Sequence, residues 1–119
     1  MKKIIIIEDE IILADALKEK LTDTGYETEV AYDGESGLEK IEQGKPDLLI
    51  LDILLPGING YQVLERLQKE EVSFPILIVS NSGQVVDIEK AKKLGAADFI
   101  VKATLSLADI EDKVKKLIG

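Results

Sequence analysis

Five short apolar runs, each followed by a stretch of helical periodicity, constrain the fold more than any other feature of this sequence. Three of these runs, residues 4–7, 48–51 and 76–79, contain no polar residue and consist of Ile, Leu and Val. Uninterrupted apolar runs of this length are typical of strands buried on both faces of a parallel sheet. Two weaker runs, residues 28–31 and 97–101, predict flanking strands.

Amphipathic stretches separate the apolar runs and predict helices. The predicted helices cover residues 10–23, 36–42, 60–69 and 85–94, and a last one begins after Ser106. Gly25 follows the first as a C-terminal glycine, Asp33-Gly34 marks a turn before the second, and Ser106 is suited to cap the last. Strands alternating with helices through short connections predict right-handed crossovers, with helices on both sheet faces. The fold class is therefore α/β, a doubly wound parallel sheet.

Length and composition narrow the choice further. The chain has 119 residues, which is the usual size of one domain, so we expect a single domain over residues 1–119. The 23 Asp and Glu against 15 Lys and Arg give a net charge of −8, so we expect no direct nucleic-acid binding by this chain. No apolar run is long enough to span a membrane, and the absence of cysteine fits the cytoplasm. With no histidine, any chemistry must use carboxylates, hydroxyls, lysine and backbone groups.

Polar residues follow four of the apolar runs at the point where each run ends. The first run is followed by Glu-Asp-Glu at residues 8–10, the third by Asp52, the fourth by Ser80 and the fifth by Lys102. Because parallel strands end at one edge of a sheet, these groups are expected to lie together. Clustered carboxylates repel one another, and Mg²⁺ would neutralise them.

This set of groups has the components for phosphoryl transfer. An Asp can act as nucleophile, the ammonium of Lys102 can bind a phosphoryl oxygen, and the hydroxyl of Ser80 can donate a hydrogen bond. The residue types and their spacing do not decide which Asp accepts the phosphoryl group.

The whole chain resembles the receiver domain of two-component response regulators. The resemblance runs from "IIIIEDE" through "LLILDILLPGINGYQVL" and "ILIVSNSG" to "GAADFIVKA", and residues 51–60 carry its strongest motif, LD-x-x-x-P-G-x-x-G. It implies a flavodoxin-like sheet in the order 2-1-3-4-5, flanked by five helices. It also implies that Asp52 is the phospho-acceptor, Lys102 the partner of the phosphate, Ser80 the switch hydroxyl and Phe99 the switch aromatic. The implied Mg²⁺ ligands are Glu8, Asp9, Asp52 and the backbone carbonyl of Leu54.

A signalling role follows from the resemblance. A histidine kinase or histidine phosphotransfer protein would phosphorylate Asp52 with Mg²⁺ present, and the fourth helix, fifth strand and fifth helix would present the altered surface to a downstream partner. A phosphorylation-dependent dimer is one possible outcome. The chain would transfer phosphate onto itself and release it slowly, which is not the turnover of an enzyme. The alternative is a degenerate receiver that acts as a binding module without phosphorylation.

Two enzymatic or cofactor-binding rivals of similar architecture fit less well. An Asp-nucleophile phosphatase would need a second acid shortly after the nucleophile and a cap over the site, but Ile53 and Leu54 follow Asp52. A flavin-binding domain would place the phosphate of its cofactor against the acidic strand ends.

Three local features set further expectations. The family usually has proline, often after a cis peptide, where this chain has Ala103, so the peptide after Lys102 is either cis or trans. Leu54 and Ser82 flank the route of water toward a phosphoryl group, and an apolar Leu54 predicts slow loss of phosphate. Residues 11–14 are Ile-Ile-Leu-Ala, and a helix covering one face cannot bury all four. Two interpretations are open: an exposed apolar surface that serves as a docking site for a phosphodonor helix, or a helix buried deep between its neighbours.

Overall fold

The computed structural model describes residues 1–81 and 85–119, which form a parallel sheet with helices on both faces. The order of the strands is β2-β1-β3-β4-β5, and every neighbouring pair is parallel. The strands are β1 (Lys3–Ile7), β2 (Glu27–Ala31), β3 (Leu48–Leu51), β4 (Ile76–Ser80) and β5 (Asp98–Val101). The predicted fold class and strand order are confirmed.

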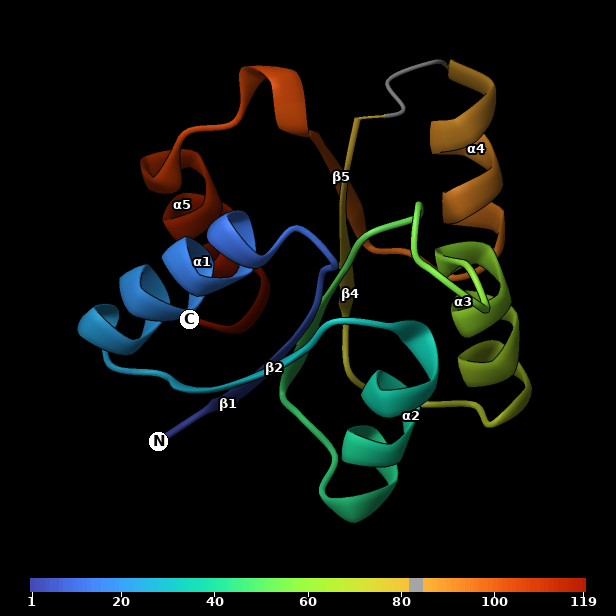
Figure 1. Cartoon of the computed structure of the whole chain (residues 1–119), viewed down its shortest axis with the longest axis horizontal. Helices are drawn as coiled ribbons and strands as arrows, with labels where there is room; N and C mark the ends of the chain where they lie inside the picture. Colours follow the sequence, from blue (N-terminus) through green and yellow to red (C-terminus); the bar gives the residue numbers. More distant parts are fainter. Residues whose placement is uncertain (82–84) are drawn as a thin grey trace.

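The helices divide between the two faces of the sheet (Figure 1). One layer contains α1 (Ile11–Thr24) and α5 (Leu107–Ile118), and the other contains α2 (Gly34–Gln43), α3 (Gly60–Lys69) and α4 (Val85–Lys93). A single 3₁₀ turn, η1 (Lys102–Thr104), follows β5. Both faces of the sheet are therefore covered, as the uninterrupted apolar runs predicted.

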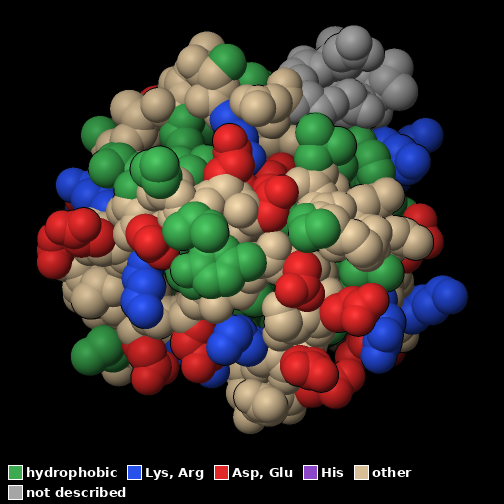
Figure 2. Space-filling model, in the orientation of Figure 1, with side chains coloured by type: hydrophobic (Ala, Val, Ile, Leu, Met, Phe, Trp, Pro, Cys, Tyr) green, Lys and Arg blue, Asp and Glu red, His purple; other side chains and the backbone are tan. Residues whose placement is uncertain are grey.

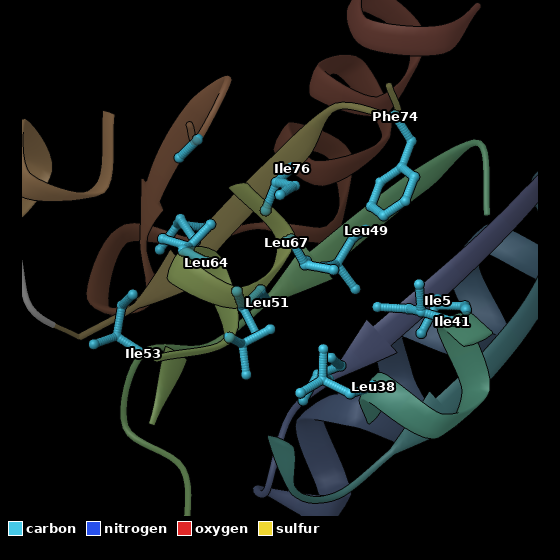
Figure 3. Packing of buried hydrophobic residues seen from close by; sticks show 14 of the residues in the cluster. Ile5, Leu38, Ile41, Leu49, Leu51, Ile53, Leu64, Leu67, Phe74 and Ile76 are labelled. Carbon is cyan, nitrogen blue, oxygen red and sulfur yellow. The ribbon is translucent and has the colours of Figure 1, made fainter. Parts of the chain in front are cut away.

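Alternate residues of the central strands enter two separate cores. Ile5, Leu49 and Ile76 pack toward the layer of α2, α3 and α4 together with Leu64 and Leu67 (Figure 3). The intervening residues pack toward α1 and α5: Ile4, Ile6, Leu48, Ile50, Leu77 and Val79. Because successive strand residues point to opposite faces, both sets must be apolar. This rigid sheet fixes the positions of the groups at its carboxyl edge.

The ends of the helices follow local capping chemistry. Gly25 ends α1 with a left-handed φ of 112°, and the side chain of Ser106 accepts a hydrogen bond from the N–H of Asp109, as predicted. The prediction was wrong for α2, which begins at Gly34 rather than at residue 36. The Asp33 carboxylate accepts the N–H of Ser36 at 2.8 Å, so Asp33 is the N-cap and Gly34 lies in the first turn.

Candidate functional site

The register of the strands brings their carboxyl ends to one edge. Ile7 pairs with Leu51, Leu51 pairs with Ile78, and Ser80 pairs with Val101. The polar residues that close or follow these strands are therefore neighbours: Glu8, Asp52, Ser80 and Lys102. The N–H of Asp52 donates to the carbonyl of Ile7 at 3.0 Å, which ties the end of β3 to the end of β1.

The Lys102 side chain contacts three carboxylates, two from the connection after β1 and one from the connection after β3. Its Nζ lies 2.8 Å from Asp52 Oδ2, 2.9 Å from Glu8 Oε1 and 2.5 Å from Glu10 Oε2. The Glu8 and Asp52 side chains are only 2% and 3% exposed, whereas that of Glu10 is 57% exposed. Two of the three carboxylates are thus withdrawn from water and depend on Lys102 for neutralisation.

Burial and mutual repulsion shift the ionisation of this cluster. Burial raises the pKa of Glu8 to about 7, and the nearby Asp52 charge adds to the effect, although the Glu10 N–H and Lys102 oppose it. Burial works against the charge on Lys102, but hydrogen bonds to Asp52, Glu10 and Glu8 outweigh it and raise the pKa of the ammonium. Lys102 is therefore a permanent positive charge between acids that repel one another.

The carboxylates fit a hard divalent cation. One oxygen each from Glu8, Glu10 and Asp52 lies within 4.8 Å of the other two. Oxygen donors without nitrogen or sulfur are the set that Mg²⁺ prefers. The cluster could therefore hold a metal ion.

The structure places Asp9 and Glu10 differently from the sequence-based expectation. Asp9 is exposed and lies outside the group of three carboxylates, whereas Glu10, which the resemblance did not name as a ligand, lies inside it. The backbone of Glu10 is extended, with φ −78° and ψ 101°, so residues 8 and 10 point the same way with the period of a strand. Continuing the alternation of β1 by three residues would have found Glu10.

The loop after β3 holds Asp52 in place. The N–H of Leu54 donates to Asp52 Oδ1 at 3.3 Å, and the N–H of Gly60 donates to the carbonyl of Ile53 at 2.8 Å. Asn59 and Gln62 form a reciprocal capping box at the start of α3. A Cβ at Gly60 would lie 2.6 Å from Cα of Ile53 and closer still to the carbonyl oxygen of Asp52, so only glycine permits this approach.

The remaining predicted residues lie at the same edge or next to it. Ser80 ends β4 and is fully buried, and Phe99 in β5 is half-buried against the core cluster of α2, α3 and α4. The peptide after Lys102 is trans, and the Lys102 side chain nevertheless reaches Asp52. Leu54 is 65% exposed beside Asp52. Ser82 lies outside the described residues.

The start of α1 carries the expected exposed apolar surface. Ile11 is 60% and Ile12 is 88% exposed, whereas Ala14 is buried, so the prediction of incomplete burial is confirmed. These side chains line a shallow groove of about 570 Å³ together with Leu13, Ala16 and the acidic pair of residues 9 and 10. Figure 2 shows hydrophobic side chains exposed among acidic and basic ones on the face that it presents.

Comparison with known proteins defines the class. The family model of the response regulator receiver domain matches residues 4–115, and the chain belongs to this family. It is 34% identical over 117 residues to the alkaline phosphatase synthesis transcriptional regulatory protein PhoP of Bacillus subtilis, covering 98% of this chain and 48% of that protein. It is 36% identical over 117 residues to the response regulator ArlR of Staphylococcus aureus, covering 98% of this chain and 51% of ArlR.

Solved structures agree with the assignment. The receiver domain of a Francisella response regulator superposes with a TM-score of 0.94 at 25% identity, covering 99% of this chain and 97% of that one. The BeF₃-activated receiver domain of Klebsiella pneumoniae RstA gives a TM-score of 0.90 at 26% identity, covering 98% and 97%.

The curated relatives are longer than this chain. The chain spans about half the length of the curated relatives it matches, and several of these are transcriptional regulators. The expectation that this chain avoids nucleic acid is therefore not supported, because net charge alone does not describe what a regulator of this kind contacts. Among the described residues, no helix has both the length and the apolar character needed to cross a membrane.

Proposed function

We propose that this chain is a single receiver domain over residues 1–119, acting in the cytoplasm, whose Asp52 accepts a phosphoryl group from a histidine kinase or a histidine phosphotransfer protein. The observation that supports this most directly is the ion pair of 2.8 Å between Lys102 and the buried Asp52 carboxylate. A buried carboxylate beside a fixed cation at the open edge of a sheet can attack phosphorus and keep the transferred group bound.

The transfer requires one bond to form and one to break. A carboxylate oxygen of Asp52 attacks phosphorus in line with the leaving group, and the bond from phosphorus to the donor's imidazole nitrogen breaks with its electron pair staying on nitrogen. Lys102 neutralises the charge that the phosphoryl oxygens bring. Leu54 holds Asp52 through its N–H, and Gly60 allows the loop to close around the nucleophile.

Magnesium is the metal proposed for the site. The residues that would hold it are Glu8, Asp9, Asp52 and the backbone carbonyl of Leu54. When bound, it neutralises the acids and draws phosphoryl oxygens toward Asp52. The burial of the Glu8 and Asp52 carboxylates side by side supports this assignment, because a divalent cation would relieve the repulsion between them.

Phosphorylation is proposed to act through the edge strand. A phosphoryl group adds negative charge and acceptor oxygens next to the end of β4. Ser80 would turn toward it, and Phe99, which is half-buried, would move into the space released. This would alter the surface of α4, β5 and α5, where a downstream protein or a second copy of the chain would bind.

The apolar start of α1 is proposed as the docking surface for the phosphodonor. Ile11 and Ile12 are exposed directly beside the acidic cluster, and the groove they line includes Asp9 and Glu10. A donor helix with apolar residues and a basic rim would match both the groove and its charge.

Incubation with Mg²⁺ and a small acyl phosphate, followed by intact mass spectrometry, tests the proposal. The natural chain should gain the mass of one phosphoryl group, and Asp52→Asn should gain none. Omission of Mg²⁺ should abolish the gain in the natural chain. An unmodified natural chain in the presence of Mg²⁺ would refute phospho-acceptor chemistry and leave the binding-module alternative.

A further inference from the structure

We infer that Glu10 is a positioning residue that occupies the third hydrogen-bonding position of Lys102 until a phosphoryl oxygen replaces it. This inference rests on the proposed function of Asp52, and it concerns a residue that the family resemblance did not include among the site residues.

The hydrogen-bonding capacity of Lys102 carries the argument. An ammonium group has three N–H donors, and Lys102 has a carboxylate within hydrogen-bonding distance for each of them. A phosphoryl group on Asp52 brings new acceptor oxygens to an ammonium that is already fully used. Phosphorylation converts the Asp52 carboxylate into an acyl phosphate, so this one contact passes to the phosphoryl oxygens. The two other carboxylates, Glu8 and Glu10, then lie beside a group of higher negative charge that repels them.

Exposure decides which partner leaves. The Glu8 side chain is almost completely buried, so turning it away from Lys102 would give its charge no access to water, which is unfavourable. The Glu10 side chain is 57% exposed and can turn into solvent, where water replaces its contact with Lys102. Glu10 is therefore the contact that exchanges.

The backbone at Glu10 supports a reversible exchange. Its N–H donates to Glu8 Oε2 at 3.0 Å, so the main chain stays fixed while the side chain swings. Glu10 immediately precedes α1, and its side chain makes no capping hydrogen bond to that helix. Moving this side chain would consequently break no capping hydrogen bond of α1.

Binding of beryllium fluoride, a mimic of the phosphoryl group, tests the inference at saturating Mg²⁺. Fluorine NMR titrations would compare the natural chain with Glu10→Gln, which removes the competing charge at constant size. Glu19→Gln is the matched control, because it removes one exposed acid from α1, the helix that follows Glu10, without touching Lys102. Glu10→Gln should bind about two- to fivefold more tightly, the ratio that one exposed ion pair supports. Glu19→Gln should bind like the natural chain.

A second readout separates positioning from a general charge effect. In nitrogen NMR without Mg²⁺ or fluoride, the Lys102 ammonium signal should shift in Glu10→Gln and stay unchanged in Glu19→Gln. The inference would be overturned, with Asp52 still the acceptor, if Glu10→Gln bound the mimic no more tightly than the natural chain. It would also be overturned if Glu10→Gln and Glu19→Gln changed binding or the Lys102 signal equally. Failure of the natural chain to bind the mimic would instead refute the proposed function and this inference with it.

Discussion

The carboxyl group of Glu8 ionises at a higher pH in the folded protein than in the unfolded chain, because burial disfavours its charge. Its pKa is raised from 4.5 to about 7, so the unfolded chain loses this proton first as the pH rises. The free energy of unfolding therefore falls between pH 4.5 and about 7 and stays reduced above that range. Glu8→Gln should stabilise the metal-free protein at pH 8 by on the order of 2 kcal/mol.

Thermal unfolding in the presence of a chelator measures this effect. The gain of Glu8→Gln should be largest at pH 8 and should vanish below pH 4.5, where the Glu8 carboxyl is protonated in both states. A gain that does not change with pH would show that Glu8→Gln acts through packing rather than through charge.

Leu54 is proposed to affect how water reaches a phosphoryl group on Asp52. Its side chain is 65% exposed beside Asp52 and offers no hydrogen bond to a water molecule. Leu54→Asn introduces an amide that can orient that water, and one hydrogen bond in the transition state corresponds to about a fivefold faster loss of phosphate. The decay of phosphorylated protein after removal of the donor measures the rate, and an equal or slower decay in Leu54→Asn would contradict the prediction.

At the scale of the elements, the connection between β3 and α3 is closely packed at Gly60, so a larger residue there is unfavourable. Gly60 lies in the first turn of α3 and approaches the backbone of Asp52 and Ile53 closely. Alanine is a better helix former than glycine by about 1 kcal/mol, but the clash with fixed backbone outweighs this gain, since overpacking costs about 1–3 kcal/mol. Gly60→Ala should therefore lower the stability and the rate of phosphorylation together.

Urea unfolding and the mass assay would measure both changes. Gly44→Ala is the matched control, because Gly44 has an extended φ of −173° and a Cβ there would meet only the flexible end of Lys3. A stable Gly60→Ala variant with normal phosphorylation would show that the loop can shift without disturbing Asp52.

The elements also show where sequence reasoning succeeds and where it stops. The uninterrupted runs at β1, β3 and β4 predicted the buried parallel sheet, because a strand that is covered on both faces buries consecutive apolar residues. The start of α2 was misplaced, because Asp33 caps a helix that begins with a glycine. The contact between Glu10 and Lys102 joins residues 92 positions apart, so only the folded sheet edge reveals it.

At the scale of the whole molecule, charge links metal binding to folding. The chain carries a net charge of −8, and two buried acids, Glu8 and Asp52, gather at one edge, where Lys102 offsets them. The folded state gathers these acids and the unfolded state separates them, so a divalent cation should bind the folded state preferentially. Magnesium should consequently stabilise the whole domain rather than the loops alone.

The effect of Mg²⁺ on stability distinguishes a metal site that includes Asp9 from a metal site that does not. At ten times its dissociation constant, Mg²⁺ should add about 1.4 kcal/mol to the free energy of unfolding and raise the melting temperature by several degrees. Asp9→Asn should lose most of this gain, although Asp9 is exposed and outside the carboxylate group of the metal-free fold. Glu19→Gln, which removes the same charge further along α1, should keep it. Thermal melts with and without Mg²⁺ measure the gain, and an undiminished gain in Asp9→Asn would assign the metal to Glu8, Glu10 and Asp52 instead.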